Sequence, residues 1–179
     1  MCTATTILEA LKGRHPASEW IFLPELRIGT GYGRNSEQRI DAWAMHTWPS
    51  KNYSRTAYEI KVSRADFLKE IKQPLKRRRA LLLSNMFFFA VPADLVKPEE
   101  IPEDCGLVYV TGNKAKVVLD APWHEGAPPT WNFMASVYRA YNLGGIRTYN
   151  DWICVCGRRM RWGTDCAFCH RKLQEPVRE

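Results

Sequence analysis

The spacing of apolar and polar residues predicts a helix followed by three strands in the first third of the chain. Apolar positions at helical spacing favour a helix over residues 5–12, which Gly13 can end. Period-two alternation and β-prone residues favour strands over 20–28, 39–46 and 56–62. We expect these strands to form an antiparallel meander at the front of the fold.

The pattern then changes to helical spacing before a run of apolar residues. It predicts a helix that begins near Ser63 and is broken at Pro74, with a second helical stretch to about residue 83. Residues 86–91 are continuously apolar, which favours a strand buried on both faces. A strand, a helical connection and a buried strand indicate a parallel crossover, so the domain is expected to be α/β.

A hairpin and a last helix complete the predicted elements. Two short strands over residues 106–119 flank Gly112-Asn113, a dipeptide that favours a tight turn. A stretch rich in Pro and Gly at 120–129 separates them from a helix over 130–143, with Thr130 as its expected cap. One face of this helix collects apolar and aromatic residues, namely Trp131, Met134, Ala135, Tyr138 and Tyr141.

Acidic residues interrupt two of the predicted strands. Asp41 lies in one of them, and Glu59 in the next is followed two positions later by Lys61. Because strand side chains alternate between faces, Glu59 and Lys61 point one way and Ile60 points the other. If the two strands are neighbours, two carboxylates and an ammonium meet, which is costly to bury unless they are paired or bind a metal. A divalent cation such as Mg²⁺ relieves the repulsion and leaves positions for water and phosphate.

The composition adds a candidate partner. The 179 residues include 26 Lys and Arg against 19 Asp and Glu, a net charge of +7. This excess suits nucleic acid, and a solvated basic surface is the alternative. The same two interpretations apply to the basic helical stretch after Glu59, where we expect phosphate contacts from Lys72, Lys76 and Arg77.

Two absences in the sequence predict a cytoplasmic protein. No apolar run approaches the ~20 residues of a membrane span. The first residues also lack the basic and apolar regions of a signal peptide.

Asp41 and the triplet Glu59-Ile60-Lys61 resemble the signature of the PD-(D/E)XK nuclease superfamily. A bare triplet of this kind occurs by chance, but a longer string from Ala57 to Phe67 resembles the MmcB-like DNA repair proteins within that superfamily. Residues 87–92 and 101–108 resemble the same proteins, so the likeness covers roughly residues 25–121.

The resemblance implies a restriction-endonuclease-like fold, in which helices flank a mixed central sheet. It implies that Asp41, Glu59 and the carbonyl of Ile60 bind Mg²⁺ or Mn²⁺. It also implies that Lys61 orients or helps to deprotonate the attacking water and offsets charge that builds on the phosphate. The acidic residue that many members carry before the Asp strand matches Glu25 or Glu9, and Glu25 is favoured because it stands in a strand pattern. Some members place a Gln in the helix after the triplet, where this chain has Gln73 next to Pro74. Ile40 stands where the superfamily often has Pro.

A cysteine cluster near the end of the chain predicts a second metal. Cys154 and Cys156 form one close pair, and Cys166 and Cys169 form another. Four thiolates at this spacing favour structural Zn²⁺, with His170 as a substitute ligand and disulfides or free thiols as alternatives. Basic residues beside the cysteines are expected to contact nucleic acid, namely Arg158, Arg159 and Arg161.

Together these features predict a nuclease-like domain at residues 1–122, a linker and helix at 123–150, and a zinc-ribbon-like module at 151–179. The expected function is metal-dependent hydrolysis of DNA in repair, recombination, or phage or defence processing. A non-catalytic DNA-binding or adaptor protein and a ribonuclease remain alternatives. Cutting both strands of a duplex would require a second copy, so a homodimer is one expected state.

Overall fold

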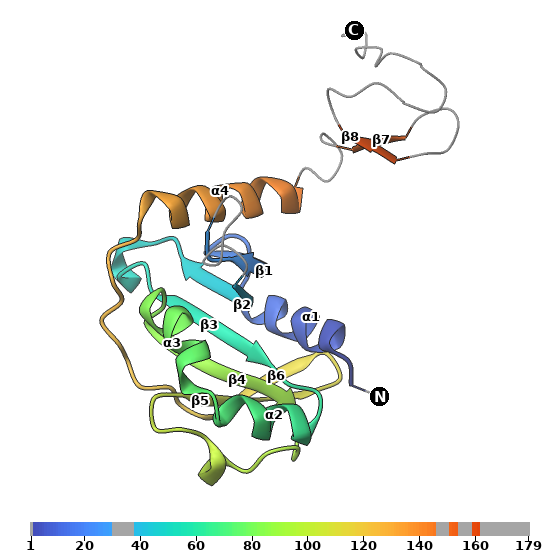
Figure 1. Ribbon diagram of the computed structural model, residues 1–179, viewed down its shortest axis with the longest axis vertical. Coiled ribbons are helices and arrows are strands. Elements are labelled where there is room, and N and C mark those ends of the chain that lie inside the picture. The colour runs from blue at the N-terminus through green and yellow to red at the C-terminus, as the bar shows by residue number, and fades with distance from the viewer. Residues whose placement is uncertain (1, 30–37, 146–150, 154–158, 162–179) are drawn as a thin grey trace, which may run out of the picture. The chain divides into compact units, whose positions relative to one another are not determined.

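The computed structural model describes residues 2–29, 38–145, 151–153 and 159–161, and the chain divides into the compact units Met1–Ala140 and Tyr141–Glu179. The first unit contains a six-stranded sheet whose spatial order follows the chain, from β1 to β6 (Figure 1). Residues 123–140, predicted as linker and helix, thus belong to the first unit. The strands are β1 (Trp20–Arg27), β2 (Arg39–His46), β3 (Arg55–Ile60), β4 (Met86–Pro92), β5 (Gly106–Thr111) and β6 (Lys114–Leu119). The helices are α1 (Ala4–Arg14), α2 (Arg64–Ile71), α3 (Pro74–Leu82) and α4 (Trp131–Gly145), with short 3-10 helices at Pro49–Lys51 and Pro98–Glu100.

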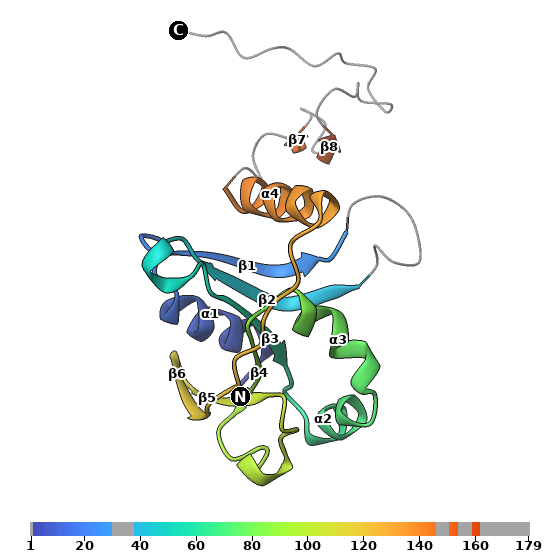
Figure 2. The ribbon, with the colours of Figure 1, turned by 90° about the vertical axis from the view of Figure 1, so that its left-hand side faces the viewer.

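The sheet is mixed, which confirms the predicted α/β class. β1, β2 and β3 pair antiparallel, β3, β4 and β5 pair parallel, and β6 returns antiparallel to β5. The connection from β3 to the parallel β4 carries α2 and α3, so the predicted crossover is present. Figure 2 shows α1 on one face of the sheet and α2 and α3 on the other.

Local sequence signals set the ends of the crossover helices. The hydroxyl of Ser63 accepts a hydrogen bond from the Asp66 amide at 3.2 Å, which caps the N-terminus of α2. α2 ends at Ile71, and α3 begins with Pro74 in its first turn, where a missing amide hydrogen has no consequence. The break therefore falls where the sequence predicts it.

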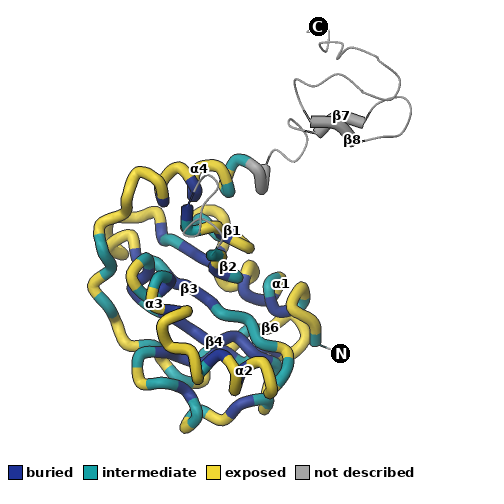
Figure 3. The backbone as a smooth tube through the Cα atoms, in the orientation of Figure 1, coloured by how far each residue is buried: buried dark blue, intermediate teal, exposed yellow. Residues whose placement is uncertain are grey.

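Two apolar clusters hold the layers together. On the α2 and α3 face, Phe67 meets Phe89 edge to face at 5.2 Å, and Phe87 meets Phe89 at 5.6 Å. On the opposite face, Ile7 and Leu11 of α1 pack in a second cluster with strand residues. β4 is buried along both faces, as Figure 3 shows by its dark blue trace.

The last helix packs on the sheet through a face other than its aromatic one. Phe133 and Val137 are buried, and Phe133 lies edge to face with Trp43 of β2 at 5.6 Å. The Thr130 hydroxyl accepts a hydrogen bond from the Phe133 amide, which confirms the predicted cap. Trp131 is 91% exposed and Tyr138 is 69% exposed, so the predicted aromatic face points to solvent.

None of the helices within the described ranges has both the length and the apolar character that crossing a membrane requires.

His15 is expected to make the first unit sensitive to acid. Its ring is buried and shares a hydrogen bond with the Tyr58 hydroxyl at 2.8 Å. Burial, with a contribution from Arg14, lowers the pKa of His15 from 6.5 to about 4. Because the unfolded chain binds the proton more tightly, this contribution to stability is complete above pH 6.5 and is lost as the pH falls toward 4.

The test is the variant His15→Gln, whose amide can still bond Tyr58 but does not titrate. Acidification from pH 7 to pH 4 should lower the free energy of unfolding of the wild type by up to roughly 3 kcal/mol more than that of the variant. Urea unfolding of both proteins at several pH values measures the difference. Equal losses in the two proteins would contradict the assignment.

Candidate active site

Asp41 and Glu59 face each other across β2 and β3. The antiparallel register pairs Ala42 with Tyr58, which places Asp41 opposite Glu59 on the face covered by α2 and α3. One Asp41 oxygen, Oδ2, accepts a hydrogen bond from the amide of Ile60 at 2.8 Å. The Asp41 carboxylate therefore links the ends of β2 and β3 through this hydrogen bond and also lies opposite Glu59.

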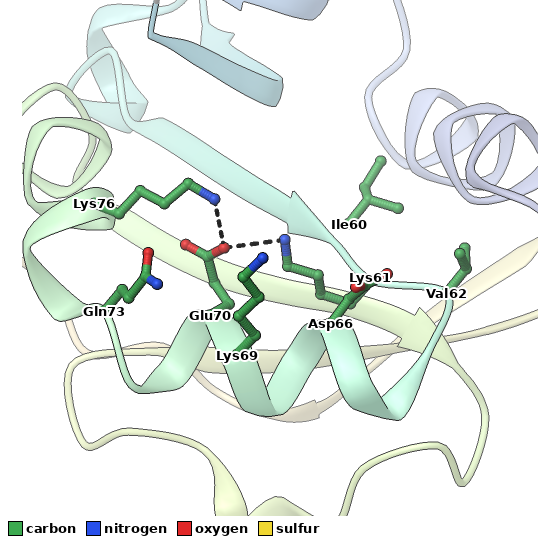
Figure 4. A pocket seen from close by; sticks show the side chains of 8 residues that line it. All are labelled: Ile60, Lys61, Val62, Asp66, Lys69, Glu70, Gln73 and Lys76. Carbon is green, nitrogen blue, oxygen red and sulfur yellow. Dashed lines mark hydrogen bonds and ion pairs between the residues drawn. The ribbon is translucent and has the colours of Figure 1, made fainter.

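Lys61 completes this arrangement directly after β3. Its Nζ lies 2.7 Å from Glu59 Oε1 and 3.2 Å from Oε2 of Glu70, a residue of α2. Lys76 of α3 reaches the same Glu70 oxygen at 2.7 Å. Figure 4 shows Lys61 and Lys76 converging on Glu70 from opposite sides.

Burial and mutual repulsion make the two strand carboxylates hard to ionise. Desolvation raises the pKa of Asp41 above its usual value, and the negative charge of Glu25 adds to this, while the Ile60 amide and Lys61 oppose it. Desolvation also raises the pKa of Glu59, and the charge of Asp41 adds to it, against the hydrogen bond from Lys61. A bound cation would relieve both effects.

Glu70 behaves in the opposite way because two ammonium groups surround it. Burial alone would raise its pKa, but the hydrogen bonds and charges of Lys76 and Lys61 outweigh burial and lower it. Burial likewise works against the charged form of Lys61, yet Glu59 and Glu70 raise its pKa. Lys61 is therefore a fully charged ammonium that two carboxylates hold in place.

The number of acidic side chains gathered here bears on which kind of metal site the residues could form. Over the described ranges, no group of three or more His, Cys, Asp and Glu side chains is close enough to hold a metal ion. Mg²⁺ usually takes one or two carboxylates and keeps several waters, so Asp41, Glu59 and the Ile60 carbonyl fit its needs.

Of the two candidates for the additional acidic residue, Glu25 lies nearer the pair. It stands on β1 with a left-handed φ of 51°, and its carboxylate pairs with Arg39 at 3.5 Å. Its negative charge adds to the effect of burial, which raises the pKa of Asp41. Glu9 is exposed on α1, which covers the opposite face of the sheet, so it is not part of this site.

A pocket of about 220 Å³ adjoins Lys61 on the α2 side. Its lining comes from the end of β3, from α2 and from the start of α3, namely Ile60, Lys61, Val62, Asp66, Lys69, Glu70, Gln73 and Lys76 (Figure 4). Gln73, whose match to the Gln of some superfamily members is left open by Pro74, lines this pocket at the start of α3. Glu70 was not predicted, although one signal marks it: it stands three residues after Phe67, on the apolar side of α2.

The predicted nucleic-acid contacts have different surroundings. Lys72 is exposed at the end of α2, and Lys76 is half exposed despite its ion pair. Arg77 is only 7% exposed because it lies on the inner side of α3 with Ala80, and it pairs with Asp104 at 3.4 Å. The position of Arg77 therefore does not fit the predicted phosphate contact.

Most of the predicted zinc module lies outside the described residues, including Arg158, His170 and the ligands Cys154, Cys156, Cys166 and Cys169. What is described is an antiparallel pair of strands, β7 (Asp151–Ile153) and β8 (Arg159–Arg161), which flank the first cysteine pair in the sequence. Arg159 and Arg161 are the ends of β8, and their side chains are outside the description.

Comparisons with known proteins bear on the fold. No protein-family model and no curated protein matches the sequence. A solved structure described as the SPO1766 protein of unknown function from Silicibacter pomeroyi superposes with a TM-score of 0.58 and 22% sequence identity. The match covers 83% of this chain and 93% of that one. This chain is therefore similar in fold to that protein over the matched residues.

Proposed function

We propose that this chain is a metal-dependent DNA endonuclease with a restriction-endonuclease-like fold and a C-terminal zinc ribbon. The observation that carries the proposal is the convergence of Asp41, Glu59 and Lys61, with the two carboxylates opposite each other at the end of β3. The net charge of +7 supports a polyanionic substrate. The fold of the first unit, a mixed sheet flanked by helices, agrees with this class.

In this proposal Asp41, Glu59 and the Ile60 carbonyl hold Mg²⁺ or Mn²⁺. When bound, the metal supplies Lewis-acid stabilisation of the phosphate and a more acidic water. The Ile60 amide fixes the Asp41 carboxylate, so this ligand is oriented before substrate arrives. Lys61 places its ammonium beside the pair, where it orients the attacking water and offsets negative charge that builds on the phosphate.

A DNA-binding protein without catalysis is the second candidate, and one observation favours it. Lys61 already gives Glu59 a cationic partner at 2.7 Å. In that case the carboxylates and lysines are a structural ion-pair network that maintains a basic DNA-binding surface.

The test is cleavage of single- and double-stranded DNA and RNA with Mg²⁺, Mn²⁺ or EDTA, comparing wild type with Asp41→Asn. The Asn side-chain oxygen can still accept from the Ile60 amide, so the variant removes charge while keeping the sheet contact. We expect DNA cleavage that needs metal and falls at least about a hundredfold in Asp41→Asn. Asp120→Asn, at an exposed position after β6, should cut like wild type.

Each other outcome selects a different interpretation. Binding of DNA without cleavage under any condition would favour the non-catalytic candidate. A preference for RNA would identify a ribonuclease. Undiminished cleavage by Asp41→Asn would show that the active site lies elsewhere.

A further inference from the structure

The pocket beside Lys61 is separate from the carboxylate pair and adjoins it. Its lining includes neither Asp41 nor Glu59. Lys61 connects the two places, because its Nζ contacts Glu59 on one side and the pocket residue Glu70 on the other. A linear substrate that occupied both places would pass Lys61.

Glu70 brings two lysines together inside this pocket. Lys61 and Lys76 come from different elements, yet both contact one oxygen of Glu70, at 3.2 and 2.7 Å. The Glu70 side chain is only 5% exposed, whereas Lys76 is 54% exposed. A single buried carboxylate thus anchors two ammonium groups, one of which reaches solvent.

The charge of the lining favours an anion. The lining includes three lysines, Lys61, Lys69 and Lys76, and two carboxylates, Asp66 and Glu70. The lining itself carries one positive charge in excess, and Glu59 outside it also pairs with Lys61. The side-chain amide of Gln73 adds neutral hydrogen-bond donors. Lysine ammonium groups bind phosphate as point charges, and a pocket of about 220 Å³ has room for a phosphate group.

We propose that this pocket binds a second phosphate of the nucleic-acid strand, next to the phosphate at Asp41 and Glu59, and that Glu70 positions Lys61 and Lys76 for it. The identity of the ligand as a nucleic acid rests on the proposed function. A second phosphate contact would fix the register and orientation of the strand across the end of β3.

The test is the salt dependence of DNA binding in EDTA, measured by fluorescence anisotropy with a labelled single strand and a labelled duplex. Each phosphate contact adds close to one unit to the slope of log affinity against log salt. Lys76→Ala should lower that slope by about one unit and weaken binding several-fold at low salt. Lys116→Ala, which removes an exposed lysine on β6, should leave both almost unchanged.

The variant Glu70→Gln distinguishes the positioning of the two lysines by Glu70 from the effect of its negative charge on DNA binding. Without an anchor the two lysines repel each other and Lys76 turns to solvent, so we expect weaker binding although a negative charge has been removed. In the Glu70→Gln background, Lys76→Ala should then add little, because the two residues act as a unit. Tighter binding by Glu70→Gln would overturn the positioning role.

The outcomes distinguish this proposal from the function it rests on. If the salt slope of DNA binding is unchanged in Lys76→Ala while the wild type shows metal-dependent cleavage, the phosphate pocket is contradicted and the nuclease is supported. If the slope is lowered in Lys76→Ala but the wild type cleaves no substrate, the phosphate pocket is supported and the nuclease is contradicted. Lys76 is half exposed, so its variant should fold, and circular dichroism checks this.

Discussion

Glu59→Gln is expected to abolish DNA cleavage and to make the folded chain more stable. The loss of activity follows from removing a proposed metal ligand: a deficit of about 4 kcal/mol in transition-state stabilisation corresponds to roughly a thousandfold lower rate. The gain in stability follows from burial and from the charge of Asp41, which raise the pKa of Glu59. An ionised Glu59 therefore lowers stability at neutral pH, and Gln removes that effect.

The pH dependence provides the check on this reasoning. Thermal unfolding should show a higher midpoint for Glu59→Gln at pH 7, and the difference should fade as the pH falls and wild-type Glu59 becomes protonated. Glu103→Gln changes an exposed carboxylate outside the site and should alter neither activity nor stability. A less stable Glu59→Gln would mean that its ion pair with Lys61 outweighs the burial and repulsion.

Loss of zinc is the second large effect that we expect. A module of 29 residues at 151–179 is too small to hold a hydrophobic core, and zinc binding supplies on the order of 10 kcal/mol to the folding of such modules. Cys166→Ser should therefore lower the zinc content from one ion per chain to nearly none and weaken DNA binding. Atomic absorption and anisotropy measure the two effects.

Cys2→Ser is the matched control, because Cys2 is a free cysteine of the first unit. It should retain zinc and DNA affinity. If Cys166→Ser keeps its zinc, the ligand set is different and His170 becomes the residue to replace. If wild-type protein carries no zinc at all, the zinc-ribbon interpretation is wrong.

The sequence predicts the strands and the carboxylate pair well because both depend on local rules. Alternation fixes which side chains share a face, and a short connection between β2 and β3 makes them neighbours, so Asp41 and Glu59 must meet. Pro74 and Ser63 mark helix ends through their own backbone chemistry. None of these predictions requires knowledge of how distant elements pack.

The predictions that differ from the structure depend on packing. Arg77 belongs to a basic run, and only the position of α3 against the sheet turns it inward toward Asp104. In the sequence the aromatic residues of α4 form the clearer apolar face. In the structure Phe133, from another side of the helix, packs against Trp43 instead. In the sequence Glu70 is one acidic residue of a predicted helix. Only the fold places Lys61 and Lys76 within ion-pair distance of it.

The strand order of the sheet also has a consequence for how the chain folds. Each strand pairs with the strand before it in the sequence, so the sheet can grow strand by strand as the chain leaves the ribosome. α1 is the exception, since Arg14 donates to the Ala115 carbonyl of β6, the last strand of the sheet, at 3.0 Å. The contacts of α1 with β6 therefore form only after that strand has been synthesised, and the part of its apolar side that is uncovered until then is a surface a chaperone would meet.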